Sequence, residues 1–460
     1  MKKRALHNLG LNMAQIQVAQ HLCKKAADER WKKSQMRDVI LAIVADPDAY
    51  TSHAIFGELA EMMSQTFEER EITAPWQQWG SDLQPEAIRQ MQNACRLPIA
   101  RRGALMPDAH VGYGLPIGGV LATKNAIIPY AVGVDIACRM RLSVLDIPES
   151  ALDDPKQRQR LRDVLEDETR FGIGASFSSP HDHEVLERDW YMTHITKKFM
   201  GKARAQLGSS GSGNHFVEYG IFTLEEDDLG LKKGTYLALL SHSGSRGPGA
   251  AVANHYSRLA RDFHPELPDE LRHLAWLDMD SEAGQEYWAA MNLMGDFAAA
   301  NHEVIHREMI ASLGATALAT VENHHNFCWK EEHDGEELYV HRKGATPAGK
   351  GVLGIIPGSM ATPAYIVRGR GEDVSLRSAS HGAGRVMSRT QAKKTLDWAD
   401  VDKKLREEGV ELISAGLDEA PGVYKDIHKV MSEQTDLVDV VARFQPKLVK
   451  MAPAGERPED

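Results

Sequence analysis

The hydrophobic pattern of the first part of the chain predicts amphipathic helices. Apolar side chains recur at the i, i+3, i+4 and i+7 spacing of a buried helix face in residues 36–44 and again in residues 56–67. Asp46-Pro47-Asp48 interrupts the pattern between them, as expected for a turn. Because no cluster of candidate chemical groups accompanies these helices, we expect residues 1–84 to form a helical N-terminal extension.

The pattern changes after residue 85, where short β-rich runs alternate with Gly/Pro turns. The runs predict strands at Ile127–Ile128, Met140–Val144, Tyr236–Leu240, Leu338–Val340, Ile355–Ile356 and Tyr365–Val367. Helical patterns cover residues 155–168, 186–206, 282–312 and 425–443. Strands and helices do not alternate strictly, which favours an α+β fold in one large domain, residues 85–451. We expect the polar tail, residues 452–460, to be disordered.

Composition and charge narrow the class of protein. The longest apolar runs are far shorter than the roughly 20 residues of a membrane helix, and polar residues interrupt the N-terminus too early for a signal peptide. The four cysteines form no C-x-x-C pair, so structural disulfides are not expected. These features predict a cytoplasmic protein. A net charge of −11 argues against a nonspecific nucleic-acid coat, yet the segment from Arg385 to Lys394 is basic.

Five glycine-framed stretches carry the candidate chemistry. Glycine accepts positive φ and lets a phosphate or metal approach the backbone. The stretches are Gly133-Val-Asp135-Ile-Ala-Cys138, Gly211-Ser-Gly213-Asn214-His215, His242-Ser-Gly-Ser-Arg246, Asn323-His-His325-Asn326 and Ser380-His381-Gly-Ala-Gly384-Arg385. Together they indicate a metal-dependent enzyme that acts on phosphates.

Four of these stretches offer metal ligands. Cys138 lies three residues after Asp135 and between two arginines, which favours the thiolate that binds metal; a small buried hydrophobe is the alternative. With His215, His242 and His325 these residues would suffice for a mixed O/N/S site for zinc, cobalt, iron or manganese. Two metals about 3.5–4 Å apart could share one ligand, as in phosphoryl transfer.

The fifth stretch surrounds His381 with glycines and arginines suited to an anion. An imidazole can form a covalent phosphoramidate, which divides a difficult transfer into two easier ones. A histidine that only contacts phosphate is the alternative from the residues alone.

Two familiar motifs are interpreted as coincidences. His302-Glu303-Val-Ile-His306 matches the H-E-x-x-H motif of zinc proteases, but no third histidine follows at metzincin spacing, and we expect a solvated helix face. Residues 344–354 resemble two nucleotide-binding loops, yet they lack the magnesium-binding Ser/Thr and a following helix. That loop could still direct Arg342 or Lys343 at a phosphate.

A longer series of motifs resembles the RtcB family of GTP-dependent RNA ligases over residues 85–450. It comprises Met106-Pro-Asp108-Ala-His110, Ile127-Ile-Pro129 with Gly133 to Cys138, Gly213-Asn-His-Phe216, His242-Ser-Gly-Ser-Arg-Gly247, His324-His-Asn326, Arg342-Lys-Gly-Ala345, Ile356-Pro-Gly-Ser-Met360 and Ser380 to Arg389. The resemblance implies a ligase that joins an RNA 3′-phosphate or 2′,3′-cyclic phosphate to a 5′-hydroxyl. It implies guanylylation of a histidine by GTP, two Mn²⁺ ions and an activated RNA 3′-ppG end, in RNA repair or tRNA splicing.

The resemblance also assigns roles to residues. His381 is the implied guanylylated histidine. One manganese would be held by Cys138, His242 and His325, and the other by Asp135, Cys138 and His215. Implied guanylate contacts are Asn214, Glu218, Asn326, Pro357, Gly358, Ser359, Met360, His381, Gly382, Ala383, Gly384 and Lys450. Implied RNA-phosphate contacts are Arg246, Arg385 and Arg389, since arginine binds phosphate in bidentate fashion.

This sequence departs from the family pattern at four positions. The family usually has lysine at Tyr113, glycine at Ala137 and at Arg139, and often a serine at Ala364. We expect the chemistry to be retained in a monomeric enzyme, with altered nucleotide affinity or RNA choice. The departures also motivate an alternative, a noncatalytic protein that binds RNA ends. Whether a protein partner recruits or activates the chain stays open.

Overall fold

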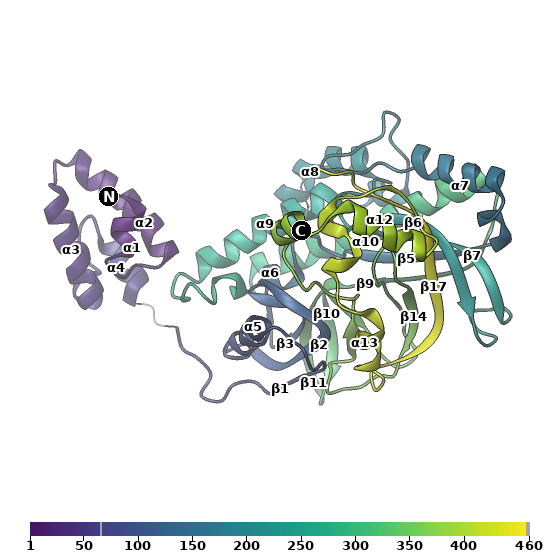
Figure 1. The fold of residues 1–460 in the computed structure, drawn as a ribbon. Coiled ribbons are helices and arrows are strands. Elements are labelled where there is room, and N and C mark those ends of the chain that lie inside the picture. The colour runs from purple at the N-terminus through teal and green to yellow at the C-terminus, as the bar shows by residue number, and fades with distance from the viewer. Residues whose placement is uncertain (65–66, 457–460) are drawn as a thin grey trace.

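The N-terminal helices form a small module with a core of its own. A computed structural model describes residues 1–64 and 67–456, apart from the side chains of residues 13 and 14. The module contains α1 (Lys3–His7), α2 (Met13–Asp28), α3 (Lys33–Ala45) and α4 (Gly57–Ser64). Leu6, Ile16, Ile40, Phe56 and Leu59 are fully or almost fully buried between these helices. Figure 1 shows the module, in purple, beside the larger body of the protein.

The first sheet of the body has five strands in the order β1-β2-β3-β11-β10. These are β1 (Trp76–Gln78), β2 (Ala100–Tyr113), β3 (Leu115–Thr123), β11 (Glu336–Lys343) and β10 (Asn326–His333). Only β1 runs parallel to its neighbour, and the other pairs are antiparallel. Helix α5 (Pro85–Cys95) packs on β2 and β3. Since β1 precedes residue 85, part of the segment expected to be helical belongs to the sheet of the body.

The second sheet has eight strands and carries most of the site. Its path is β13 (Leu353–Ile356), β14 (Ala364–Gly369), β17 (Val438–Met451), β6 (Phe216–Leu224), β7 (Gly234–Ser243), β5 (Arg139–Leu145) and β9 (Ala317–His324), with β16 (Glu411–Ser414) beside β17. Helices α7 (Pro155–Asp167) and α10 (Glu282–Leu313) pack against it. Two small sheets pair β4 (Ala126–Ile127) with β8 (Leu277–Asp278) and β12 (Ala345–Pro347) with β15 (Ser378–Ser380).

The remaining helices lie around the two sheets, and α8 and α9 pack on each other (Figure 1). They are α6 (Pro129–Val132), α8 (His194–Gln206), α9 (Arg246–Phe263), α11 (Arg389–Thr395), α12 (Trp398–Glu407) and α13 (Ile427–Ser432). The architecture is mixed α+β with an N-terminal helical region, as predicted. Across residues 1–64 and 67–456, no helix combines the length and apolarity that a membrane span requires. Residues 457–460 of the expected tail lie outside the described residues.

The helix predicted over residues 425–443 is wrong in its second half. Helix α13 ends at Ser432, and β17 begins at Val438. This strand lies between β6 and β14, where ladder hydrogen bonds to both neighbours favour extended backbone. Tertiary pairing therefore overrides the local helical pattern.

The H-E-x-x-H segment is also not the solvated helix face that we expected. His302 and His306 lie on the buried face of α10, against β5 and β7. Ser241 Oγ lies 2.7 Å from His302 Nδ1 and 2.9 Å from His306 Nε2, while Ser143 Oγ lies 2.8 Å from His306 Nδ1. Burial lowers the pKa of both imidazoles well below the usual range. Because serines occupy these nitrogens, the two histidines are structural and the protease interpretation fails.

Candidate functional site

Four neighbouring strands, β6, β7, β5 and β9, bring the predicted metal ligands to one end of the large sheet. Asp135 and Cys138 lie in the turn between α6 and β5, and His215 immediately precedes β6. His242 lies in β7, opposite Met140 of β5 and Phe216 of β6. His325 lies between β9 and β10, and its backbone N–H donates to the Cys138 carbonyl. Residues 190 positions apart in the chain therefore meet because their strands pair.

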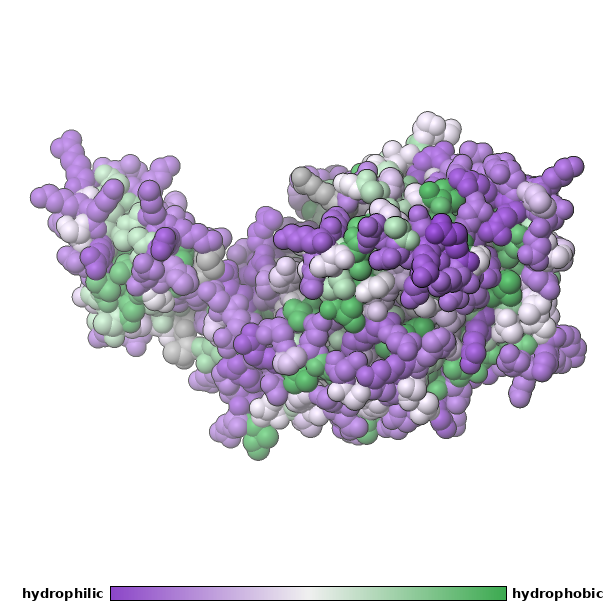
Figure 2. Space-filling model, viewed as in Figure 1, coloured by the Kyte–Doolittle hydropathy of each residue, from purple (hydrophilic) through white to green (hydrophobic). Residues whose placement is uncertain are grey.

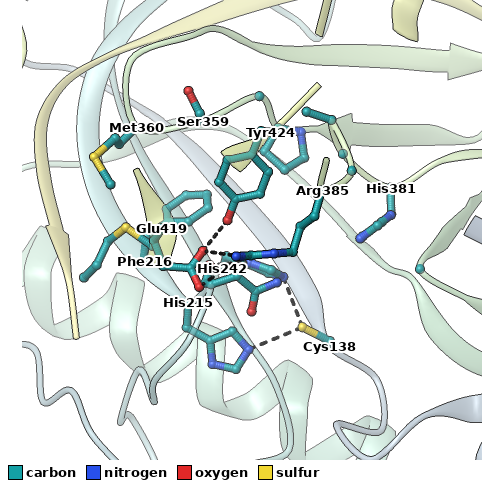
Figure 3. Close-up of a pocket in the computed structure, with 18 of the residues that line it drawn as sticks. Cys138, His215, Phe216, His242, Ser359, Met360, His381, Arg385, Glu419 and Tyr424 are labelled. Atoms are coloured by element: carbon teal, nitrogen blue, oxygen red, sulfur yellow. Dashed lines mark hydrogen bonds and ion pairs between the residues drawn. The ribbon is translucent and has the colours of Figure 1, made fainter. Parts of the chain in front are cut away.

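The five side chains form two ligand triads that share the thiol of Cys138. One triad is Cys138, His242 and His325, and the other is Asp135, Cys138 and His215; the donor atoms of each lie within 4.8 Å of one another. Cys138 Sγ lies 3.0 Å from His242 Nε2 and 3.5 Å from His215 Nε2. His215 Nε2 lies 3.0 Å from Asp135 Oδ2, and the Nε2 atoms of His242 and His325 are 3.3 Å apart. Figure 3 shows Cys138 between His215 and His242.

The protonation of these groups fits a metal site. Burial, with the neighbouring His215, lowers the pKa of His242 to about 3, so its imidazole is neutral. His242 Nδ1 lies 3.1 Å from the Asn214 carbonyl, which holds a proton on Nδ1 and leaves the Nε2 lone pair directed at the cluster. Burial alone would raise the pKa of Asp135, but His215 and Arg246 outweigh it and lower that pKa. A neutral imidazole near a carboxylate and a thiol provides the kinds of donor that divalent transition metals bind.

His381 is held by a buried carboxylate that our sequence interpretation did not assign. Asp108 Oδ2 lies 2.6 Å from His381 Nδ1 and also accepts the backbone N–H of His381 at 3.1 Å. Burial by itself would raise the pKa of Asp108, but His381 beside it lowers that pKa, so the carboxylate is ionised. The His381 ring centroid lies 5.0 Å from that of His325, a member of the ligand cluster. The available signal for Asp108 was its place in the motif from Met106 to His110.

One pocket contains nearly all of the predicted site residues. Its walls include the five ligands, His381, and the predicted guanylate contacts Asn214, Glu218, Asn326, Pro357, Gly358, Ser359, Met360, Gly382, Ala383 and Gly384. Glu218 is buried, and this burial raises the pKa of its carboxyl group well above the usual range. A buried carboxyl group facing a pocket fits a ligand that presents N–H donors.

Lys450 and Arg246 do not line this pocket. On β17 the pocket contacts Val449 and Met451, so the intervening Lys450 points to the opposite face. Lys450 Nζ instead donates to the carbonyls of Leu165 and Glu166, at 3.2 and 3.1 Å. In this structure the neighbours of Lys450 on β17, and not Lys450 itself, line the pocket in which the guanylate contact was predicted.

Arg246 packs against the ligand cluster on the side of His215 that faces away from Cys138. Its side chain is buried, and Nη1 lies 3.4 Å from His215 Nδ1 while Nε donates to Ser209 Oγ at 3.3 Å. A Cβ on Gly211 would lie 2.3 Å from that Nη1, so glycine is required for this close approach. The predicted contact of Arg246 with RNA phosphate is not available in this arrangement, because the guanidinium packs against a ligand histidine.

The other two predicted RNA-phosphate residues are anchored by an acidic residue. Arg385 pairs with Glu419 at 3.3 Å, and Arg389 pairs with Glu419 and, at 3.3 Å, with Asp418. Tyr424 also donates its hydroxyl to Glu419. Figure 3 shows Glu419 joined to Arg385 and Tyr424. Glu419 positions both arginines at the pocket wall, and no local pattern in the sequence indicated this role.

Two departures from the family pattern have clear structural settings. Ala137 has φ of +57°, in the left-handed region where glycine is favoured, and its N–H donates to the Asn326 carbonyl at 2.7 Å. Arg139 is buried at the start of β5, where it pairs with Glu322 at 3.1 Å and contacts His324 Nδ1 at 3.2 Å. Arg139 thus extends away from the ligand cluster although Cys138 precedes it.

The glycine-rich loop that follows β11 does not present Arg342 to a phosphate, contrary to the expectation. Arg342 is buried and makes a bidentate pair with Glu331, at 2.6 and 3.2 Å. Lys343 is buried as well, and its Nζ donates to the Tyr113 carbonyl at 2.7 Å. Both cations are therefore engaged within the five-stranded sheet.

Comparison with known proteins agrees with the motifs and the geometry. The family model described as "tRNA-splicing ligase RtcB" matches residues 90–451. The chain is 36% identical over 399 residues to "RNA-splicing ligase RtcB" of Escherichia coli K12, covering 80% of this chain and 95% of the relative. It is 32% identical over 437 residues to "tRNA-splicing ligase RtcB" of Nanoarchaeum equitans, covering 78% and 90%. The protein belongs to the RtcB family of RNA ligases.

Proposed function

We propose that this chain joins RNA ends that carry a 3′-phosphate or 2′,3′-cyclic phosphate to 5′-hydroxyl ends, with GTP and Mn²⁺. The observation that carries the proposal is a carboxylate-oriented histidine, His381, in one pocket with two ligand triads that share Cys138. A nucleophile and a phosphate-directed metal cluster are the two parts that nucleotidyl transfer needs.

His381 is the proposed nucleophile toward GTP. Asp108 accepts a hydrogen bond from the Nδ1–H of His381, which leaves the Nε2 lone pair to attack the α-phosphorus. An N–P bond forms, the bond from the α-phosphorus to the bridging oxygen breaks, and pyrophosphate leaves. Backbone N–H groups of the glycine-rich turn after His381 are suited to the developing negative charge.

The rest of the pocket would bind the guanylate. The Glu218 carboxyl group can accept hydrogen bonds from the N–H groups of guanine. The turn from Pro357 to Met360 provides the opposite wall. Lys450 would make no guanylate contact in this arrangement, because its side chain lies on the other face of β17.

The ligand cluster fits two manganese ions. Cys138, His242 and His325 would hold one ion, and Asp135, Cys138 and His215 would hold the other. When bound, the ions supply Lewis-acid stabilisation of phosphoryl oxygens. The Asn214 carbonyl keeps the His242 lone pair aimed at the cluster.

Two further transfers complete the proposed reaction. A 2′,3′-cyclic end is first hydrolysed to the 3′-phosphate. An oxygen of that phosphate attacks the phosphorus bound to His381, the N–P bond breaks, and an RNA 3′-ppG end forms. The 5′-hydroxyl then attacks the phosphorus attached to the RNA 3′ oxygen, loses its proton and releases GMP. Arg385 and Arg389, held by Glu419, are suited to bind the RNA phosphates.

Labelled GTP provides the test. With Mn²⁺, α-labelled GTP should give a covalent protein adduct and γ-labelled GTP should not. His381→Ala should abolish the adduct, while His255→Ala, at an exposed histidine of α9, should not change it. An adduct on His381→Ala would contradict the mechanism. RNA-end binding without an adduct in the wild type, under varied metals, would favour the noncatalytic alternative.

A further inference from the structure

The hairpin between β2 and β3 presents an exposed aromatic residue at its tip. Tyr113 is 67% exposed, and its ring centroid lies 5.7 Å from that of His273. Gly114 has φ of +70°, and a Cβ there would lie 2.9 Å from the His273 Cβ, so the tip packs closely on His273. The ring of Tyr113 is therefore held in place while its surface remains accessible.

A continuous series of contacts connects this tip with the nucleotidyl-transfer pocket. A Cβ on Gly344 would lie 3.0 Å from His381 Cε1, which places the Gly344 backbone beside the nucleophile. The preceding residue, Lys343, donates to the Tyr113 carbonyl and lies 4.9 Å above the Tyr130 ring. The Tyr130 ring is in turn 4.7 Å from His273. Tyr113 and His273 therefore belong to one chain of contacting residues that leads away from His381.

His273, at the end of this chain of contacts, also lines a second cavity. Its walls carry three arginines, Arg258, Arg261 and Arg272, and two carboxylates, one of which pairs with Arg272 at 3.7 Å. Gln17 of α2 forms the opposite side. In Figure 2 the hollow between the N-terminal module and the body is bordered by hydrophilic side chains.

The N-terminal module is positioned to form the outer wall of this cavity. Asn12, the N-cap of α2, donates its side-chain N–H to the carbonyls of Pro265 and Leu267, at 3.0 and 3.5 Å. Residues 1–33 contain eight lysines and arginines and two acidic residues, although the whole chain has a net charge of −11. Over residues 1–64 the module has nine basic and seven acidic residues, so it is weakly basic in a chain that is acidic overall.

We propose that this surface, here called the Tyr113–Arg261 track, binds single-stranded RNA as it leaves the pocket of His381. Exposed rings that stack on bases, alternating with cations that contact phosphates, are the combination that binds single strands. Tyr113 and His273 would stack on bases, and Arg258 and Arg261 would contact phosphates. The N-terminal helices would extend the contact. The inference rests on the proposed ligase function and adds a location for the RNA strand.

The test measures binding of a fluorescent single-stranded RNA with a 3′-phosphate to the full-length protein at several salt concentrations. Tyr113→Ala should weaken binding roughly tenfold without changing the salt dependence, because the lost contact is stacking. Tyr113→Phe should keep the affinity. Arg261→Ala should weaken binding and lower the slope of log K against log salt by about 0.7, the value for one phosphate contact on a single strand.

Matched controls come from the same chain. Tyr191 is 66% exposed and also lies beside a lysine, and Arg188 is an exposed arginine remote in sequence from the track. Tyr191→Ala and Arg188→Ala should leave affinity and salt slope unchanged. Equal affinities for the track variants and these controls would overturn the proposal. The proposal would also be overturned if Arg261→Ala lost binding of an acidic peptide but kept its binding of RNA. That result would show that the cavity binds a protein.

Guanylylation separates this inference from the proposed function. Each track variant should still form the GMP adduct, since neither Tyr113 nor Arg261 lines the pocket of His381. No adduct in the wild type would refute the ligase mechanism. Normal adduct formation with unchanged RNA binding in every track variant would refute the track alone.

Discussion

Asp108 Oδ2 lies 2.6 Å from Nδ1 of His381, although 273 positions separate the two residues in the chain. The buried carboxylate selects the tautomer of His381 and fixes the direction of its ring. The same oxygen accepts the backbone N–H groups of His381 and Gly382. The proposed nucleophile is therefore oriented through both its side chain and its backbone in the absence of nucleotide.

Asp108→Asn tests this orientation. The amide can donate to Nδ1 and so favour the wrong tautomer, and we expect GMP-adduct formation to slow by about 10³–10⁴-fold, as for the orienting carboxylate of a catalytic triad. The rate is measured with labelled GTP under single-turnover conditions. Asp436→Asn, at a carboxylate that accepts the Trp79 indole N–H, is the control. Equal rates for the two variants would show that Asp108 does not orient the nucleophile.

The shared thiol makes a prediction about metal stoichiometry. Cys138 belongs to both triads, whereas His215 and His325 belong to one each. Mn²⁺ binding measured by equilibrium dialysis should fall from two ions to none in Cys138→Ala and to one in His215→Ala. Cys328→Ala, at a buried cysteine outside the cluster, should keep both ions. Two ions in Cys138→Ala would contradict a bridging role.

Ala137 should limit stability because of its backbone conformation. An L-residue in the left-handed region costs about 1–2 kcal/mol, and glycine avoids this cost but gains entropy in the unfolded chain. We expect Ala137→Gly to raise the free energy of unfolding by about 0.5–1 kcal/mol. Ala94→Gly, inside helix α5, should lower it by about 1 kcal/mol. Chemical denaturation measures both, and a loss of stability in Ala137→Gly would contradict the strain.

The ion pair between the partly buried Glu331 and the buried Arg342 should make the free energy of unfolding depend on pH. Burial alone would raise the pKa of Glu331, but His333 and Arg342 lower it to about 2. Since the folded pKa lies below the unfolded value of about 4.3, the stabilisation is complete above that value and disappears as pH falls toward 2. The difference in unfolding free energy between wild type and Glu331→Gln should therefore narrow over this window.

At neutral pH, Glu331→Gln should lower the free energy of unfolding by about 3 kcal/mol, because the Arg342 guanidinium stays buried without its counter-charge. Glu336→Gln is the matched control in the same strand pair, since the side chain of Glu336 is more exposed than that of Glu331 and pairs with Lys124. Its effect should stay within about 1 kcal/mol. Equal losses for the two variants would show that burial of the pair is not what stabilises the sheet.

Local patterns predicted much of the fold. The predicted strands Met140–Val144 and Tyr236–Leu240 lie within β5 and β7, and α10 follows from its apolar stripe. The error over residues 425–443 arose where a central strand is stabilised by its neighbours on both sides. A hydrophobic period of 3.6 or 2 residues indicates which side chains face the core. It does not indicate which neighbouring strand is available to pair with the backbone.

The sequence by itself determined the family, the order of the site motifs and the donor atoms that they contain. Tertiary structure decided how those atoms are shared and oriented: Cys138 between two triads, Asp108 behind His381, Glu419 holding Arg385, and Lys450 on the far face of β17. Motifs are local, and strand alternation and pairing determine direction and proximity between distant segments. For this reason the residues that orient the site, unlike those expected to carry its chemistry, could be identified only once the sheets were assembled.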